Sequence, residues 1–103
     1  MHWKQALEQK ITEALSPTVI RIVDDSNAHA GHLEHAPSAL PSHLKLLVVS
    51  DTFKGIPLLA RQRIMHKIMA EEMKTIHAIS FKLHTPEEFE DKLTQFKQNN
   101  PSM

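Results

Sequence analysis

The spacing of apolar residues divides the chain into helical and extended stretches. In residues 3–15 apolar side chains recur every three or four positions, which is typical of a helix that buries one face. Ser16-Pro17 ends this helix because a residue before proline disfavours the α conformation. Residues 64–73 repeat the same spacing, after a short helical segment that Pro57 can start over residues 58–60. The pattern so far predicts three helices, of which the second is short.

A fourth helix is predicted near the end of the chain. Thr85-Pro-Glu-Glu88 is a capping box with proline at the first helical position. Phe89, Leu93 and Phe96 then form a single apolar stripe along the helix. The polar residues 99–103 predict a flexible tail.

Three other stretches predict β-strands. Residues 18–23 are rich in β-branched side chains, and residues 44–49 are almost continuously apolar, as expected at the centre of a small sheet. Residues 76–83 alternate, with His77 on the same side as the apolar residues. The order helix, strand, strand, helix, helix, strand, helix predicts one α+β domain over residues 1–98, with helices packed on one face of a three-stranded sheet.

Composition narrows the function classes. Twelve Lys and Arg residues balance twelve Asp and Glu residues, so the chain lacks the large positive field of a general nucleic-acid binder. The absence of cysteine excludes disulfides, thiolate ligands and a cysteine nucleophile from this chain. No apolar run approaches the ~20 residues that span a bilayer. We therefore expect a cytoplasmic protein.

Three of the eight histidines lie in the long connection between the first two strands, in the segment His29-Ala-Gly-His-Leu-Glu-His35. Three imidazoles and a water can hold zinc, but closed structural zinc sites usually include cysteine, which makes this interpretation the weaker one. Asp24, Ser26 and His29 are the residue types of a hydrolytic triad. They are crowded within six positions and lack an oxyanion-type glycine turn, so we do not expect an enzyme.

Several short segments are spread over residues 7–90: Val23-Asp-Asp-Ser26, His29-Ala-Gly-His32, His43, Val48-Val-Ser50, Phe53-Lys-Gly55, Arg61-Gln-Arg63 and Ile76-His-Ala-Ile79. In order and spacing these segments resemble the BolA family. The resemblance implies an αββααβ domain similar to the class II KH fold, here with a closing helix. It also implies a monothiol glutaredoxin as partner and a two-iron two-sulfur cluster shared between the two proteins. The family's usual Arg-His-Arg and Thr-His-Phe are Arg61-Gln62-Arg63 and Ser42-His43-Leu44 in this chain.

Histidines without cysteine can supply half of such a site. Two imidazoles can replace two cysteines on one iron of a cluster, so the remaining ligands would come from outside. The resemblance names a glutaredoxin cysteine and the thiol of glutathione. It also implies that His77 is one ligand and favours His29 as the second, with His43 and His32 as further candidates.

A second hypothesis is DNA binding in transcription regulation, which the resemblance also implies for the helix-turn-helix region. Residues 52–70 carry four basic side chains and no acidic one: Lys54, Arg61, Arg63 and Lys67. A guanidinium suits a phosphate, a glutathione carboxylate or an acidic partner surface equally well, so this cationic strip does not choose among them. The Gly-x-x-Gly loop of nucleic-acid-binding KH domains is absent. Without a partner, a homodimer of this chain is a further candidate assembly.

Overall fold

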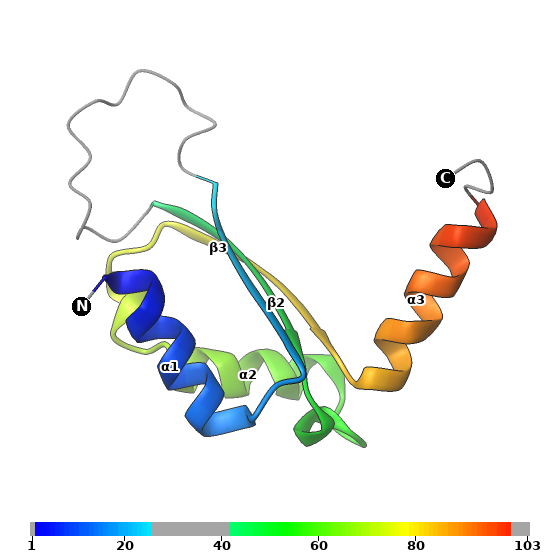
Figure 1. Ribbon diagram of the computed structural model, residues 1–103. Coiled ribbons are helices and arrows are strands. Elements are labelled where there is room, and N and C mark those ends of the chain that lie inside the picture. Colours follow the sequence, from blue (N-terminus) through cyan, green and yellow to red (C-terminus); the bar gives the residue numbers. More distant parts are fainter. Residues whose placement is uncertain (1, 26–41, 100–103) are drawn as a thin grey trace.

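The computed structural model describes residues 2–25 and 42–99, which form one domain of helices packed on a sheet (Figure 1). The elements are α1 (Trp3–Leu15), β1 (Val19–Asp24), β2 (His43–Val49), α2 (Leu58–Ile68), β3 (Ala78–His84) and α3 (Pro86–Asn99), with short 3-10 helices η2 (Asp51–Phe53) and η3 (Glu72–Lys74). The predicted α+β class and order of elements are confirmed. Within the described ranges, no helix combines the length and apolar character needed to cross a membrane.

The sheet has the strand order β1-β2-β3, so β2 is its central strand, as its continuous apolar run predicts. β1 pairs antiparallel with β2, and β2 pairs parallel with β3. The parallel pair requires a crossover, which α2 provides. The register sets His43 opposite Ala78 at one end of the sheet and Val49 opposite His84 at the other.

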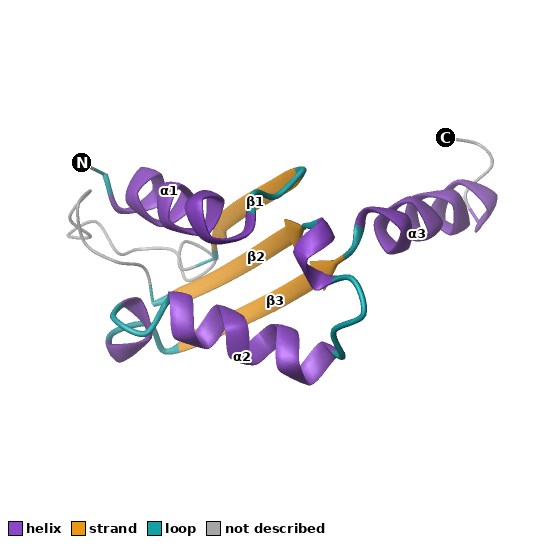
Figure 2. Cartoon of the chain, turned by 90° about the horizontal axis from the view of Figure 1, so that it is seen from below, coloured by secondary structure: helices purple, strands orange, loops and turns teal. Residues whose placement is uncertain are grey.

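Two helices, α1 and α2, cover one face of the sheet (Figure 2). Strand alternation directs Leu44, Leu46 and Val48 of β2 towards these helices, and all three are buried. The core contains Leu7, Ile11 and Leu15 from α1, Met65 and Met69 from α2 and the turn after it, and Ile22, Phe53, Ile76 and Leu83 from the other elements. The methionines of the predicted helical stripe therefore fill the core, as Met commonly does.

The helical region after β2 differs in detail from the prediction. The expected short helix at residues 58–60 and the first part of the longer one form a single helix, α2, which begins directly after Pro57 and ends at Ile68. The expected continuation to residue 73 is replaced by a turn and the 3-10 helix η3. No glycine or proline interrupts residues 58–68, so nothing separates the two segments. The short helix of this region lies earlier, as η2, and Gly55 forms the turn after it with a φ of 75°.

The closing helix α3 leaves the sheet instead of packing on the α1 and α2 face (Figure 1). Its apolar stripe was expected to be buried, but Leu93 is 45% exposed and Phe96 is 52% exposed. Only Thr85 separates β3 from α3, so the first turn of the helix fixes its direction. Within the described residues, the sheet face opposite α1 and α2 is consequently left open. The expected tail, residues 99–103, lies outside the described residues except for Asn99.

Ser50 links the end of β2 to the end of α1. Its side chain is fully buried, and its hydroxyl donates to the carbonyl of Leu15 at 2.6 Å while accepting from the backbone N–H of Thr52 at 3.1 Å. The Thr52 hydroxyl donates to the same carbonyl at 3.2 Å. Ser50 thus donates a hydrogen bond to a carbonyl in the last turn of α1 and also caps η2.

We predict that Ser50→Ala lowers the free energy of unfolding by about 1–3 kcal/mol, because it removes a buried donor and leaves buried polar groups short of partners. Urea denaturation followed by circular dichroism measures this change. The matched control is Ser80→Ala on the open sheet face, where the side chain is exposed and the expected change is within about 0.5 kcal/mol. Equal midpoints for the two variants would contradict this role of Ser50.

Candidate functional site

Backbone hydrogen bonds gather the two anchors of the histidine-rich connection and two of the predicted ligands at one end of the sheet. The carbonyl of Ser42 accepts from the N–H of His77 at 3.0 Å and from that of Ala78 at 3.2 Å. The N–H of Asp25 donates to the carbonyl of His43 at 3.0 Å. The two ends of the connection, Asp25 and Ser42, therefore lie at the end of the sheet where His77 lies, with Ser42 directly beside it.

His77 lies directly before β3, and its side chain is exposed. Within the described residues the imidazole of His77 makes no hydrogen bond. His43 is half-buried at the first position of β2, where its Nδ1 lies 2.9 Å from the hydroxyl oxygen of Ser42. One accessible imidazole directly before β3 and one partly fixed imidazole on β2 thus lie at the same end of the sheet.

The other predicted ligands, His29 and His32, lie outside the described residues, as does the alternative zinc site with His35. Among residues 2–25 and 42–99, no three side chains of His, Cys, Asp or Glu come together as a metal site. A metal site that includes His77 or His43 would therefore need further donors from the connection or from another molecule.

Two further histidines, His2 and His66, contact neighbouring residues of the fold. The Nδ1 of His2 accepts from the N–H of Lys4 at 3.2 Å and caps α1. His66 is exposed on α2, with its ring centroid 5.7 Å from that of Phe81. His2 thus caps a helix end, and His66 lies at the surface of α2.

His84 lies at the opposite end of the sheet from His77, and its ring stacks on that of Phe89 with centroids 6.3 Å apart. Burial lowers the pKa of His84, and the nearby charge of Lys92 lowers it further. The Nδ1 of His84 is 4.0 Å from a carboxylate oxygen of Glu88, but a ring that stays neutral makes no ion pair with it.

The four cations of the predicted strip do not form one surface. Lys54, Arg63 and Lys67 are exposed, and Lys54 pairs with Glu87 at 3.4 Å. Arg61, in contrast, is buried. The outer side of α2 instead exposes two apolar residues that the sequence pattern placed in a helix but did not mark as exposed: Leu58 is 65% exposed and Leu59 is 61% exposed.

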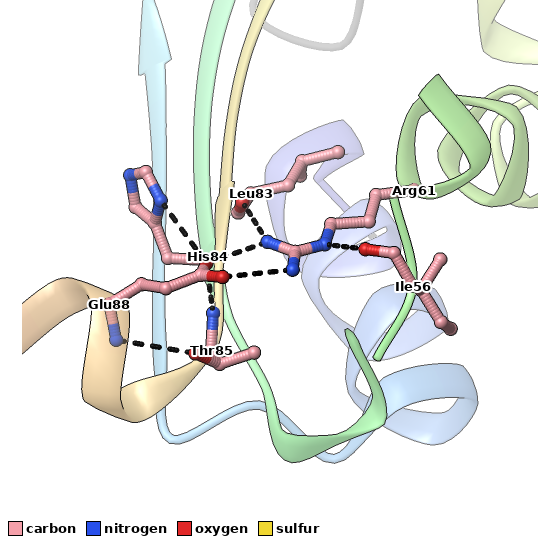
Figure 3. Close-up of polar contacts among 6 residues, drawn as sticks. All are labelled: Ile56, Arg61, Leu83, His84, Thr85 and Glu88. Carbon is pink, nitrogen blue, oxygen red and sulfur yellow. Dashed lines mark hydrogen bonds and ion pairs between the residues drawn. The ribbon is translucent and has the colours of Figure 1, made fainter. Parts of the chain in front are cut away.

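Four of the five N–H donors of Arg61 form hydrogen bonds within the chain (Figure 3). Its Nε donates to the carbonyl of Ile56 at 2.7 Å, and its Nη1 donates to the carbonyl of Leu83 at 3.0 Å. Nη1 and Nη2 also donate to the two carboxylate oxygens of Glu88, at 2.7 and 3.0 Å. The guanidinium further lies over the ring of Phe53. Arg61 therefore joins α2, β3 and α3, and a phosphate or partner would reach it only by breaking these bonds.

Glu88 has two roles at this junction. It completes the predicted capping box, because its carboxylate accepts from the N–H of Thr85 at 3.0 Å while its own N–H donates to the Thr85 hydroxyl at 3.2 Å. The bidentate bond from Arg61, followed by the bond from Thr85, lowers the pKa of Glu88 to about 2. The same pairing raises the pKa of Arg61.

We predict that Glu88→Gln makes stability less sensitive to acid. At neutral pH the wild type is more stable by about 1 kcal/mol, a value reduced by the partial exposure of the carboxylate to water. As the pH falls from about 4.5 towards about 2, the unfolded chain binds a proton at Glu88 that the folded chain does not, so this advantage disappears. Urea titrations at a series of pH values measure the difference. An advantage that stays constant down to pH 2 would contradict the assigned pKa.

Comparison with known proteins places this geometry in a family. A family model described as BolA-like protein matches residues 11–88. The chain belongs to the BolA family. It is 33% identical over 88 residues to the DNA-binding transcriptional regulator BolA of Escherichia coli, covering 84% of this chain and 79% of that protein. It is also 33% identical over 87 residues to human BolA-like protein 1, covering 84% of this chain but only 60% of the human protein.

A solved structure confirms the family fold. BolA1 from Arabidopsis thaliana superposes with a TM-score of 0.75 and 29% sequence identity, over 85% of this chain and 96% of that one. The αββααβα order and the three-stranded mixed sheet described above are thus those of a BolA protein. The sequence resemblance to the family and the KH-like fold it implied are confirmed.

Proposed function

We propose that this BolA-like chain binds a monothiol glutaredoxin and shares a two-iron two-sulfur cluster with it, without catalysing a reaction itself. The cluster is the cargo or the sensed ligand, and the chain would act in its assembly, transfer or sensing in the cytoplasm. The observation that carries the proposal is the exposure of His77 at the end of the sheet where the histidine-rich connection begins and ends.

The length of the connection supports a second ligand from it. His29 follows Asp25 by four residues, so an extended chain keeps their Cα atoms within about 14 Å. The corresponding limit for His32 is about 25 Å. Asp25 is itself tied to His43, on the strand that neighbours His77. Chain length thus allows either histidine. The resemblance to the family makes His29 the preferred second ligand, while His32 and His43 are alternatives.

The donor chemistry supports the need for a partner. A chain without cysteine can offer one iron two imidazoles, and a two-iron two-sulfur cluster accepts this on one of its irons. The other iron then takes sulfur ligands, which a glutaredoxin cysteine and glutathione supply. Lys67 lies near the end of α2 from which the chain runs towards His77, where its ammonium suits a glutathione carboxylate or an acidic partner.

We predict that His77→Ala changes the cluster formed with a monothiol glutaredoxin and glutathione. Anaerobic reconstitution of the mixture, followed by visible absorption and circular dichroism, measures the cluster environment. Wild type is expected to give a spectrum different from that of glutaredoxin alone, and His77→Ala to give the glutaredoxin spectrum. His66→Ala is the matched control, because it removes another exposed imidazole and should behave as wild type. A wild-type spectrum from His77→Ala would remove His77 from the site.

DNA binding is the second candidate function. The Escherichia coli relative is named a DNA-binding transcriptional regulator, and α2 exposes Arg63 and Lys67 with no ion pair to either among the described residues. Arg61 already donates hydrogen bonds to the carbonyl of Leu83 and the carboxylate of Glu88, so contacts with DNA phosphates would come from Arg63 and Lys67.

We predict that Arg63→Ala combined with Lys67→Ala weakens any DNA affinity and reduces its dependence on salt. For every phosphate that the protein no longer neutralises, the slope of log affinity against log salt becomes shallower by about 0.9. Fluorescence anisotropy over a salt series measures both quantities, with Lys4→Ala on the exposed side of α1 as the control. An unchanged slope in the double variant would exclude α2 as the DNA-binding element, whatever the outcome with glutaredoxin.

A further inference from the structure

An ion pair ties the turn that leads from α2 to His77 to the first helix of the chain. The Nζ of Lys10, on α1, donates to both carboxylate oxygens of Glu72, at 3.0 and 2.9 Å, although the two residues are 62 positions apart in the sequence. The side chain of Glu72 is only 16% exposed. Water and salt therefore screen this contact less than they screen an ion pair at the surface.

The main chain of Glu72 closes the same turn. Its carbonyl accepts from the N–H groups of Thr75 and Ile76, both at 3.2 Å, and from the Thr75 hydroxyl at 3.3 Å. Ile76 is buried in the core, and the next residue is His77. Glu72 therefore joins the side chain of Lys10 to the stretch of backbone that presents His77.

The imidazole of His77 depends on this backbone for its position. It is exposed, and it makes no hydrogen bond of its own to the part of the chain that the structure describes. The N–H of His77 donates to the carbonyl of Ser42 at 3.0 Å, which supports the backbone from the side of β2. The turn closed by Glu72 supports it from the side of α1. A ligand is held in place only when the structure behind it is rigid.

The same turn contains another ion pair, which does not reach α1. The Nζ of Lys74 lies 3.2 Å from a carboxylate oxygen of Glu71, three positions earlier in the sequence. The two side chains are 69% and 77% exposed, and an exposed pair of this kind contributes little to stability. It has the same two residue types as the pair of Lys10 with Glu72 and lies close to His77 in the sequence, so it serves as a matched control.

We infer that Lys10 and Glu72 are positioning residues for His77, because their ion pair holds the turn before β3 against α1 and so keeps the imidazole in place for iron. The inference rests on the proposed function, in which His77 is a cluster ligand. Lys10 and Glu72 act through the backbone and need no contact with the cluster. The helix α1, which carries none of the predicted ligands, thus becomes part of the support of the cluster site.

Amide hydrogen exchange of the full chain without a partner measures how firmly His77 is held. Its amide exchanges only when the bond to the carbonyl of Ser42 opens. Lys10→Met and Glu72→Gln each remove the ion pair with little change in side-chain size. In each variant the His77 amide should exchange at least about threefold faster, as expected when its opening no longer breaks an ion pair.

The amide of Leu46, on the central strand, separates this role from a general effect on stability. It belongs to the core of the sheet and exchanges on global unfolding, so it should be much slower than the His77 amide. Faster exchange at Leu46 with an unchanged rate at His77 would mean that the ion pair only stabilises the fold, and would overturn the inference.

A charge swap and the control pair complete the comparison. The chain with both Lys10→Glu and Glu72→Lys restores opposite charges, so its His77 amide should exchange at the wild-type rate. Lys74→Met and Glu71→Gln should also match wild type. Control variants that exchange as fast as the test variants, or a swapped chain that stays as fast as the single variants, would contradict the assigned role.

The cluster formed with a monothiol glutaredoxin and glutathione gives the functional readout. After anaerobic reconstitution, Lys10→Met and Glu72→Gln should lose the shared cluster to an iron chelator at least about threefold faster than wild type, and the swapped chain should not. Wild-type cluster lifetimes in the two single variants would overturn this inference and leave the proposed function intact. If wild type itself gives only the glutaredoxin spectrum, the proposed function fails, and the role of the ion pair at the cluster fails with it.

Discussion

The parallel pairing of β2 with β3 is the constraint on which the other features of this molecule depend. Its register sets His43 opposite Ala78, which brings His77 and both ends of the histidine-rich connection to one end of the sheet. A shift by one residue would exchange the faces of every side chain on β3. The same pairing places His84 at the other end, where β3 meets α3. The two ends therefore have different chemistry, one exposing imidazole and the other burying a charged junction.

The buried junction explains why a basic residue of the cationic strip is not part of its surface. Arg61 donates to two backbone carbonyls and to Glu88 from a position that is 5% exposed. Glu88, in contrast, remains partly exposed to water, so the pair is buried only on its arginine side. The arginine thus fixes the direction of α3, and that direction leaves both the helix stripe and one sheet face available for contacts.

Local patterns in the sequence were sufficient for the elements but not for the junction. The capping box at Thr85 and Glu88, the central strand β2 and the apolar stripe of α2 were predicted from spacing and residue type alone. The burial of Arg61 could not be predicted in this way. Two of its acceptors are the backbone carbonyls of Ile56 and Leu83, and every residue has such a carbonyl, so the residue types do not reveal which ones accept. The sequence does contain a signal for the exposure of Leu58 and Leu59, because both lie outside the apolar stripe that begins at Ile64.

The functional account depends on imidazoles of this chain binding iron beside sulfur ligands that the chain lacks. Pulsed electron paramagnetic resonance of the reduced cluster, formed between glutaredoxin and this chain labelled with ¹⁵N-histidine, tests it most directly. The account predicts ¹⁵N couplings of directly bound nitrogens from two histidines, and the loss of both in His77→Ala, in which the cluster stays with glutaredoxin alone. A reduced cluster without any ¹⁵N coupling to this chain would contradict it.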